Sequence, residues 1–186
     1  HKEYRRQRQM CIRDRKKGAR SSEFEIAIQW LLDCGLVYKV NRVNEPHMPL
    51  KAYKNMNAYK LFVLDVGLLG AMSELPAESI LEGNDIFVEF KGALTEQYVL
   101  QQLISDTPYT PYYYGNEKAT FEQDFLVQKA KSIVPIEVKA EQNIRSHSLK
   151  TYCEKFQPEE AVRFSTLKYK EQEWMVNIPL YAVCNL

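Results

Sequence analysis

Two short apolar segments, 121–127 and 133–139, constrain this chain most, because each carries a carboxylate inside a strand-like pattern. Side chains alternate between the two faces of a strand, so Glu137 and Lys139 share one face, roughly 6 to 7 Å apart. Asp124 lies in the middle of the first segment, directly before the apolar residues Phe125, Leu126 and Val127, which indicate burial. A buried carboxylate needs a hydrogen-bonding partner, a metal ion or a proton, so these two strands indicate a functional site.

A third carboxylate falls on a helical stripe that would otherwise be apolar. In the helix predicted over 86–104, with an interruption near Gly92, Glu96 shares a face with Ala93, Leu100 and Leu103. In the strand 121–127, regular alternation places Asp124 on the face of Glu122 and Leu126. We therefore expect Glu96, Asp124 and Glu137 to converge, with Lys139 beside them. Such a group offers the hard oxygen ligands and the cation that Mg²⁺-assisted phosphodiester hydrolysis requires.

The remaining pattern predicts a mixed α/β (α+β) fold. Ser22 with Glu25 forms a capping box, and Gly35 supplies a stop for a helix of about twelve residues. Further strands are predicted over 36–43, 58–63, 112–114, 161–165 and 174–180, and further helices over 66–72 and 148–156.

The order of these elements predicts two domains. Helix, strand, loop and strand over 21–75 make a winged-helix-like segment. The helix, three-stranded meander, helix and strand over 85–186 make a second domain with a mixed sheet. The polar connection over 76–84 is the expected boundary.

The net charge of +1 hides an asymmetry between the two parts of the sequence. Residues 1–20 carry nine Lys or Arg and two acids, which leaves 16 basic and 22 acidic residues in 21–186, a net charge of about −6. The body therefore lacks the broad basic surface that supplies non-specific nucleic-acid affinity. The leader 1–20 is predicted to be disordered or non-native, because it has neither helical nor strand periodicity and the sequence begins at His1.

Composition limits the other classes of protein to which this chain can belong. With 45% hydrophobic residues the chain can build a core, and no apolar run is long enough to span a bilayer, so we expect a cytoplasmic protein without a membrane anchor. The four cysteines show no CxxC spacing, so neither a zinc site nor a disulfide framework is predicted. Oligomeric state cannot be inferred.

Several separate motifs resemble one family. The stretch FEQDFLV…IVPIEVKAE resembles the Asp…Glu-x-Lys core of restriction-endonuclease-like, PD-(D/E)XK nucleases. More closely, LDCGLV, AYKLFVLDVGLL, GALTEQYVLQQL and RSHSLKTY are similar to the C-terminal region of bacterial and archaeal AAA-type ATPases. The resemblance covers roughly residues 18–186.

The resemblance implies a nuclease-like domain that follows an ATPase module. It implies Asp124 and Glu137 as Mg²⁺ ligands, Lys139 as the catalytic lysine and Glu96 as the helix-borne acid. The sequence departs from the pattern at Gln123, usually aliphatic, and at Pro135, which cannot donate a ladder hydrogen bond. No G-x-x-x-x-G-K-[ST] motif occurs, so no ATP site is expected in this chain.

Three functional interpretations remain open from the sequence. The first is Mg²⁺-dependent phosphodiester hydrolysis at Glu96, Asp124, Glu137 and Lys139, on DNA or RNA. The second is a catalytically silent docking module for the ATPase. The third is a winged-helix DNA-binding protein with the basic leader as its arm. His47 and His147 are predicted to be surface or capping residues, and the tyrosines over 109–114 to pack in the sheet.

Overall fold

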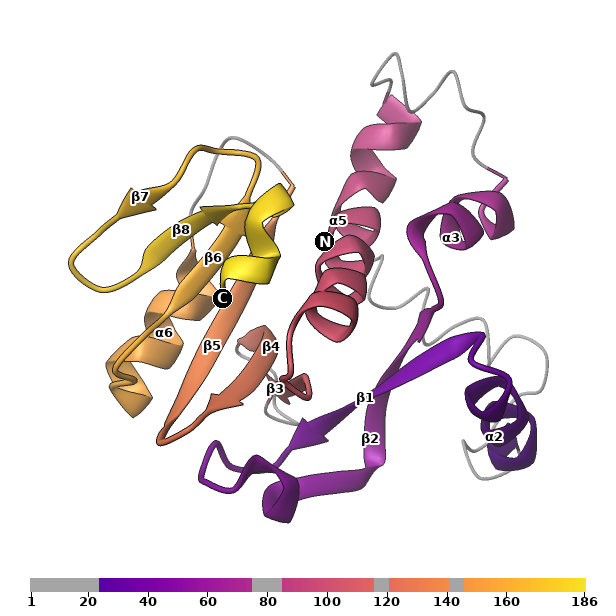
Figure 1. Cartoon of the computed structure of the whole chain (residues 1–186), viewed down its shortest axis with the longest axis horizontal. Coiled ribbons are helices and arrows are strands. Elements are labelled where there is room, and N and C mark those ends of the chain that lie inside the picture. Colours follow the sequence, from indigo (N-terminus) through magenta and orange to yellow (C-terminus); the bar gives the residue numbers. More distant parts are fainter. Residues whose placement is uncertain (1–23, 75–84, 116–120, 141–145) are drawn as a thin grey trace. The chain divides into compact units, whose positions relative to one another are not determined.

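The computed structural model describes residues 24–74, 85–115, 121–140 and 146–186 (Figure 1). The chain forms two compact units, residues 1–37 and 38–186. The leader 1–20 lies outside the described residues. None of the helices in the described part has the length and apolar character that a membrane-spanning helix needs. Of the cysteines in the described ranges, Cys34 and Cys184 are exposed to solvent.

The first unit contains helix α2, Glu25–Asp33. Gly35 has a φ of 70°, and the N–H groups of Gly35 and Leu36 donate to the carbonyls of Leu32 and Leu31. This left-handed ending is the predicted glycine stop, which is confirmed. Ser22, half of the predicted capping box, lies outside the described residues.

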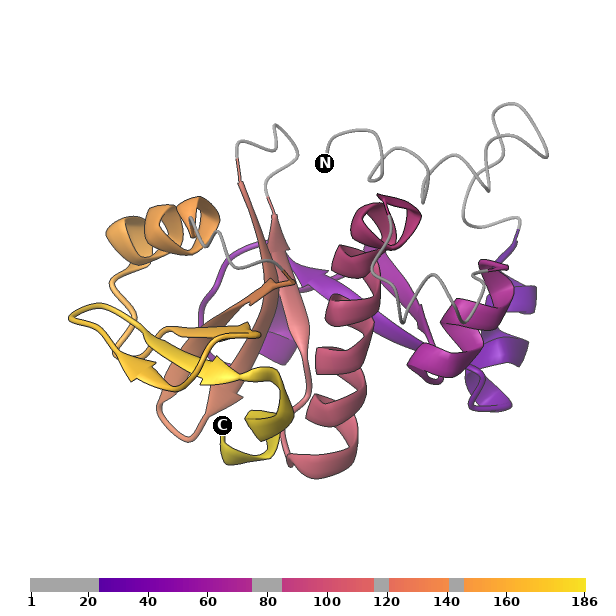
Figure 2. The same ribbon diagram turned by 90° about the horizontal axis from the view of Figure 1, so that it is seen from above.

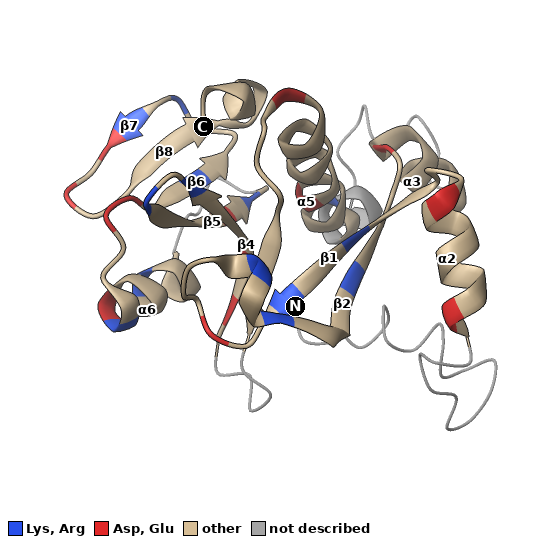
Figure 3. Cartoon of the chain, turned by 60° about the horizontal axis from the view of Figure 1, so that its bottom comes forward, with Lys and Arg blue, Asp and Glu red and all other residues tan. Residues whose placement is uncertain are grey.

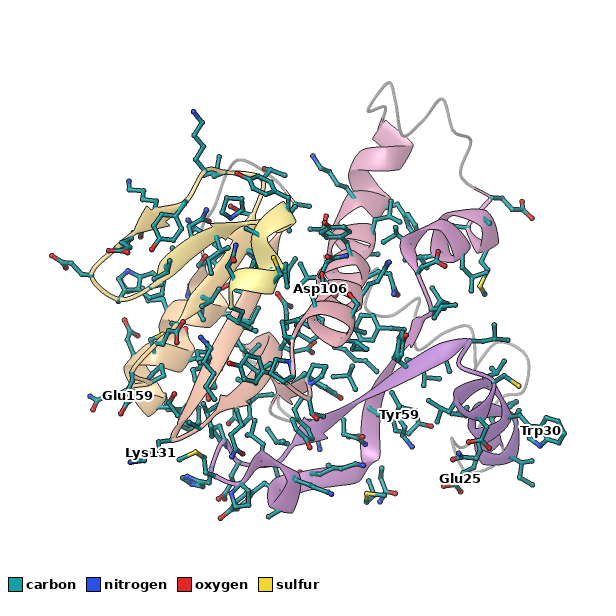
Figure 4. The ribbon with its side chains drawn as sticks, in the orientation of Figure 1. Glu25, Trp30, Tyr59, Asp106, Lys131 and Glu159 are labelled. Carbon is teal, nitrogen blue, oxygen red and sulfur yellow. The ribbon has the colours of Figure 1, made fainter. Side chains whose placement is uncertain are left out.

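Helix α2 exposes large apolar side chains. Ile28 is buried, whereas Ile26 is 78% exposed and Trp30 is 70% exposed. Figure 4 shows the Trp30 side chain projecting outward from the helix. Exposed apolar residues at this spacing on one short helix are more typical of a contact surface than of a solvated face.

The second unit is built on one eight-stranded mixed sheet of order β2-β1-β3-β4-β5-β6-β8-β7. Strands β3, β4 and β5 form the predicted antiparallel meander, while β1 runs parallel to β3, and β6 runs parallel to both β5 and β8. The mixed α/β class is therefore confirmed. The strands are β1 Val37–Val43, β2 Lys54–Val63, β3 Tyr112–Gly115, β4 Glu122–Lys129, β5 Ser132–Lys139, β6 Val162–Ser165, β7 Lys170–Glu171 and β8 Val176–Pro179.

In the described part of this unit, three α-helices and two short 3-10 helices accompany the sheet. The α-helices are α3 Val66–Met72, α5 Asp85–Asp106 and α6 His147–Phe156, and the 3-10 helices are η2 Leu50–Tyr53 and η3 Leu180–Asn185. Helix α5 runs through Gly92 without a break, so the predicted interruption there is wrong. A single glycine inside a helix costs only about 1 kcal/mol, and a long helix with a buried face tolerates it.

Helices cover both faces of the sheet, and each face has its own core (Figure 2). On one face, Val99, Leu100 and Leu103 of α5 pack with Phe125 and with further strand residues. On the other face, Tyr152 of α6 packs with apolar side chains of β3 and β4: Tyr112, Tyr114 and Leu126. The predicted packing role of residues Tyr112, Tyr113 and Tyr114 is confirmed, since all three are buried.

Strands β1 and β2 belong to the same sheet as β3 to β8. The sequence places these two strands in the winged-helix-like segment, and the structure adds them to the meander through the parallel pairing of β1 with β3. The connection over 76–84, where the sequence places the boundary, lies outside the described residues.

Pro135 lies at a position of β5 that pairs with β4 but not yet with β6. It lies opposite Leu126 in the β4–β5 ladder, and the ladder between β5 and β6 begins one residue later, at Ile136. Of the two consequences open to a proline here, a local irregularity or an unpaired side of the strand, the structure shows the second, because the strand has not yet met β6 at Pro135.

Truncating the buried Phe125 tests the core on the α5 face. Phe125 is fully buried and its ring centroid lies 5.9 Å from that of Phe62. We expect Phe125→Ala to lower the free energy of unfolding by about 3–5 kcal/mol, because it leaves a cavity. Tyr181→Ala, at a side chain that is 80% exposed, should change it by less than about 0.5 kcal/mol. Urea denaturation measures both, and equal effects would contradict the assigned core.

Candidate functional site

Strand β4 has one extra residue close to Asp124. Tyr112 pairs with Leu126, but Tyr114 pairs with Gln123, so three steps along β4 match two steps along β3. Such a bulge breaks the alternation of side chains. Leu126 faces α6, whereas Phe125 packs in the core on the α5 face. Asp124 lies within this irregular stretch and interacts electrostatically with Glu96 of α5 and with Lys60 of β2.

The backbone ladder between β4 and β5 gives way to side-chain contacts beside this bulge. The paired register ends at Phe125 and Ile136. Beyond it, the Val138 N–H donates to Asp124 Oδ2 at 2.9 Å, and Gln123 Nε2 donates to the Ile136 carbonyl at 2.5 Å. Gln123, unusual in such a strand, is thus explained as a substitute for backbone pairing, because it satisfies a buried carbonyl.

Lys60 links the acids on the α5 side of the sheet. Its Nζ lies 2.9 Å from Glu96 Oε1 and 2.7 Å from Glu122 Oε1. All three side chains are mostly buried, with exposed fractions of 19% for Lys60, 15% for Glu96 and 21% for Glu122. We call Lys60, Glu96, Glu122 and Asp124 the acid centre.

Sequence reasoning missed Lys60 and did not assign Glu122 to the site. A signal was present, because Lys60 stands inside an otherwise apolar run, AYKLFV, just as Glu96 stands on an apolar helical stripe. An opposite pair of such misplaced charges indicates an ion pair. The pairing itself depends on β2 lying near α5, which the patterns do not show.

The charges of the acid centre shift one another's protonation. Burial by itself lowers the pKa of Lys60, but the carboxylates of Glu96, Glu122 and Asp124 outweigh it and raise that pKa above its ordinary value. Burial raises the pKa of Asp124 to about 7, with a further contribution from Glu96. Lys60 and the Val138 N–H oppose this rise in the pKa of Asp124, and Glu137 adds to it weakly. Asp124 therefore exchanges its proton near neutral pH.

Glu137 contacts Lys139 on its own strand and the first turn of helix α6. It is 3% exposed, its Oε1 lies 2.6 Å from Lys139 Nζ, and its Oε2 accepts the Leu149 N–H at 3.0 Å. Leu149 lies in the first turn of α6, where Ser146 at the N-cap makes no side-chain cap bond. Glu137 thus supplies from β5 the acceptor that the helix start requires.

A buried guanidinium lies on the strand beside Glu137. Arg163 pairs in register with Glu137 across β5 and β6, and burial lowers its pKa while Glu137 opposes that change. Arg163 Nε donates to Asn177 Oδ1 at 2.8 Å, and its Nη1 contacts Ser146 Oγ at 3.3 Å. The hydroxyl of Ser146 is therefore engaged with Arg163, and Glu137 takes over the helix cap.

The four predicted site residues thus divide into two groups. Glu96 and Asp124 belong to the acid centre, while Glu137 and Lys139 form a pair that also caps α6. The groups remain electrostatically linked, because Glu137 raises the pKa of Asp124. His47 and His147 are exposed, which confirms their predicted surface positions.

The arrangement does not fit Mg²⁺ as it stands. Within 24–74, 85–115, 121–140 and 146–186, no three His, Cys, Asp or Glu side chains are placed to hold a metal ion. The Lys60 ammonium lies between Glu96 and Glu122, where a cation bound to those acids would have to sit. Both Glu137 oxygens already face donors of the protein.

Comparison with known proteins gives two matches. Residues 91–182 match the model of a domain of unknown function (DUF4143), and residues 10–79 match the model of a second domain of unknown function (DUF8612). No curated protein and no solved structure matches the chain. The acid centre draws on both matched segments, because Lys60 lies in the second and Glu96 in the first.

Removing the charge of Asp124 tests its raised pKa. Between about pH 3.8 and about pH 7, Asp124 keeps its proton in the folded chain but has lost it in the unfolded chain. This group therefore makes the free energy of unfolding fall as the pH rises. Asp124→Asn cannot ionise and keeps an oxygen for Val138. The free energy of unfolding of Asp124→Asn, minus that of the wild type, should therefore increase as the pH rises through this range. Urea denaturation at several pH values measures it, and a constant difference would contradict the assignment.

Removing Glu137 tests its role as a cap. Glu137→Ala leaves the buried Leu149 N–H without its acceptor and removes a negative charge beside Arg163, so we expect a loss of about 1–3 kcal/mol of stability and faster amide exchange in the first turn of α6. Glu154→Ala, on the same helix and 67% exposed, should change stability by less than about 0.5 kcal/mol. Similar losses in both variants would show that the cap has no special role.

Proposed function

We propose that this chain is a docking module of nuclease-like, winged-helix-containing architecture, in which the acids of the nuclease pattern serve as an internal ion-pair centre. The observation that carries this proposal is Lys60, whose Nζ lies within 3.0 Å of carboxylate oxygens of both Glu96 and Glu122. The similarity to the C-terminal regions of AAA-type ATPases supports the nuclease-like fold and suggests the partner.

Lys60 gives the acid centre the positive charge that a metal would otherwise supply. Mg²⁺ needs near-octahedral oxygen ligation, and to reach Glu96 and Glu122 it would have to displace a mostly buried ammonium. An ammonium deprived of its carboxylates in a buried position costs several kcal/mol. This cost favours the protein's own cation over an added one.

The proposed partner is the ATPase module that the resemblance implies. The exposed apolar side chains of α2, Ile26 and Trp30, support a binding role, because large apolar residues on one short helix gain most by being covered. The negative charge of residues 21–186 supports a protein partner over a nucleic acid.

A metal titration and a cleavage assay together test the proposal. Calorimetry with Mg²⁺ and Mn²⁺ at millimolar concentrations should show no saturable binding to the wild type. Plasmid and single-stranded DNA and RNA should stay uncut by the wild type and by Lys139→Ala alike. Lys60→Met, which removes the internal cation, should bind divalent ions more tightly than the wild type. Cleavage by the wild type that Lys139→Ala abolishes would overturn the docking proposal.

Metal-dependent phosphodiester hydrolysis is the second candidate function. It is favoured by the short contact of 2.6 Å between Lys139 Nζ and Glu137 Oε1 and by the raised pKa of Asp124, since strongly shifted carboxyl groups gather at active sites. The same assay separates the two candidates, because hydrolysis requires Lys139 and docking does not.

A further inference from the structure

Helix α2 carries two apolar stripes. The first contains Ile28, which is buried, and Leu32, which is partly buried. The second is exposed, and its members follow the spacing i, i+1, i+4, i+5 and i+8, which places them side by side along the helix. We call this exposed group the outer stripe, and it consists of Ile26, Ala27, Trp30, Leu31 and Cys34. A helix that is apolar on both sides is typical of one that is covered on both sides.

The outer stripe leaves α2 with little packing of its own. Ile26 and Trp30 are 78% and 70% exposed, and Leu31 is 41% exposed. In α2, which the structure describes from end to end, Ile28 is the single buried residue. A helix of nine residues is below the length of about 12–15 residues at which helices become stable alone, so it depends on packing. Covering the outer stripe would supply that packing.

A row of polar and acidic side chains borders the outer stripe on one side. Glu25, Gln29 and Asp33 are exposed and follow the spacing i, i+4 and i+8, so they lie along one line of the helix. Gln29 Nε2 donates to Asp33 Oδ1 at 2.7 Å. Residues 24–37 contain these two acids and no Lys, Arg or His. Figure 3 accordingly shows red but no blue on α2. We call this line the acidic row.

The acidic row distinguishes between the surfaces that could cover the outer stripe. A second copy of α2 would bring a like-charged row, since antiparallel pairing places Glu25 near Asp33 of the other copy. Nucleic acids and anionic membranes are negatively charged and would repel the same row. A protein surface with an apolar groove and with Lys or Arg along one edge complements both the stripe and the row.

We propose that the outer stripe of α2 inserts into an apolar groove of a partner protein, with basic side chains of the partner facing Glu25 and Asp33. This inference rests on the proposed docking function, because it names the side chains that make the contact and the chemistry of the partner's surface. Trp30 lies in the middle of the stripe and is the central anchor, since buried tryptophans are prominent among the residues that dominate binding energy.

Two synthetic peptides serve as probes of the partner's chemistry. One is an amphipathic helix of leucine and lysine, and the other has glutamate in place of every lysine. Each is titrated into the whole chain carrying Trp174→Phe, so that Trp30 is the single tryptophan and reports on the stripe. The lysine peptide should shift the emission of Trp30 to shorter wavelength and bind at least about tenfold more tightly than the glutamate peptide. Equal affinities, or no binding of the lysine peptide at millimolar concentration, would overturn the proposal.

A matched pair of double variants tests the acidic row. Glu25→Lys combined with Asp33→Lys should reverse the preference, so that the glutamate peptide binds more tightly. Glu154→Lys combined with Glu159→Lys makes the same charge change at exposed positions outside α2 and should leave the preference unchanged. The same response in both double variants would show that total charge, and not α2, selects the peptide. Thermal unfolding confirms that each variant is folded.

The free chain tests the other occupants. Acrylamide should quench Trp30 readily before any peptide is added, and a protected Trp30 in a monomeric chain would mean that the chain itself covers the stripe. Analytical ultracentrifugation should show no dimer that Trp30→Ala abolishes, because such a dimer would make a second copy the occupant. Either result would overturn the proposed partner. These measurements do not involve Lys139, so they are separate from the cleavage assay that decides the docking function itself.

Discussion

The single extra residue in β4 is the constraint on which the charged part of this sheet depends. It lies beside Asp124, which interacts electrostatically with Glu96 and Lys60, and the backbone ladder between β4 and β5 ends next to it, at Phe125. Two freed backbone groups, the Ile136 carbonyl and the Val138 N–H, find side-chain partners in Gln123 and Asp124, although the Gln123 side-chain oxygen itself is buried without a hydrogen-bond partner. The bulge thus separates Glu122, which contacts Lys60, from Leu126, which packs in the core on the α6 face.

Much of the fold could be predicted from periodicity, because burial on a strand or a helix follows a fixed spacing. The meander, α6 and the glycine stop after α2 were predictable in this way. The position of Asp124 was not, because a bulge arises from pairing with β3 and leaves no mark in the pattern of β4 itself. The ion pair between Lys60 and Glu96 was hidden for a similar reason, since it joins segments 36 residues apart.

Glu137 shows why residue type and spacing alone do not decide between a catalytic and a structural role. The carboxylate and the ammonium of Lys139 lie together on one strand face, as alternation predicts. The same carboxylate also caps α6 and lies in register with the buried Arg163, contacts that no local pattern reveals. Such an acid contributes to stability even where it has no catalytic role, because removing it leaves the buried Leu149 N–H without its acceptor.

Strand β3 carries aromatic side chains into the cores on both faces of the sheet. Adjacent side chains of a strand point to opposite faces, so Tyr113 places its ring 5.1 Å from Lys60 Nζ while the Tyr114 ring packs against Tyr152 and Phe156 of α6. A substitution within β3 therefore disturbs both cores together. Lys60 lies on β2 and Lys139 on β5, so each lysine can be changed while β3 stays intact. The acid centre and the Glu137–Lys139 pair are for that reason separable by experiment, even though one sheet carries both.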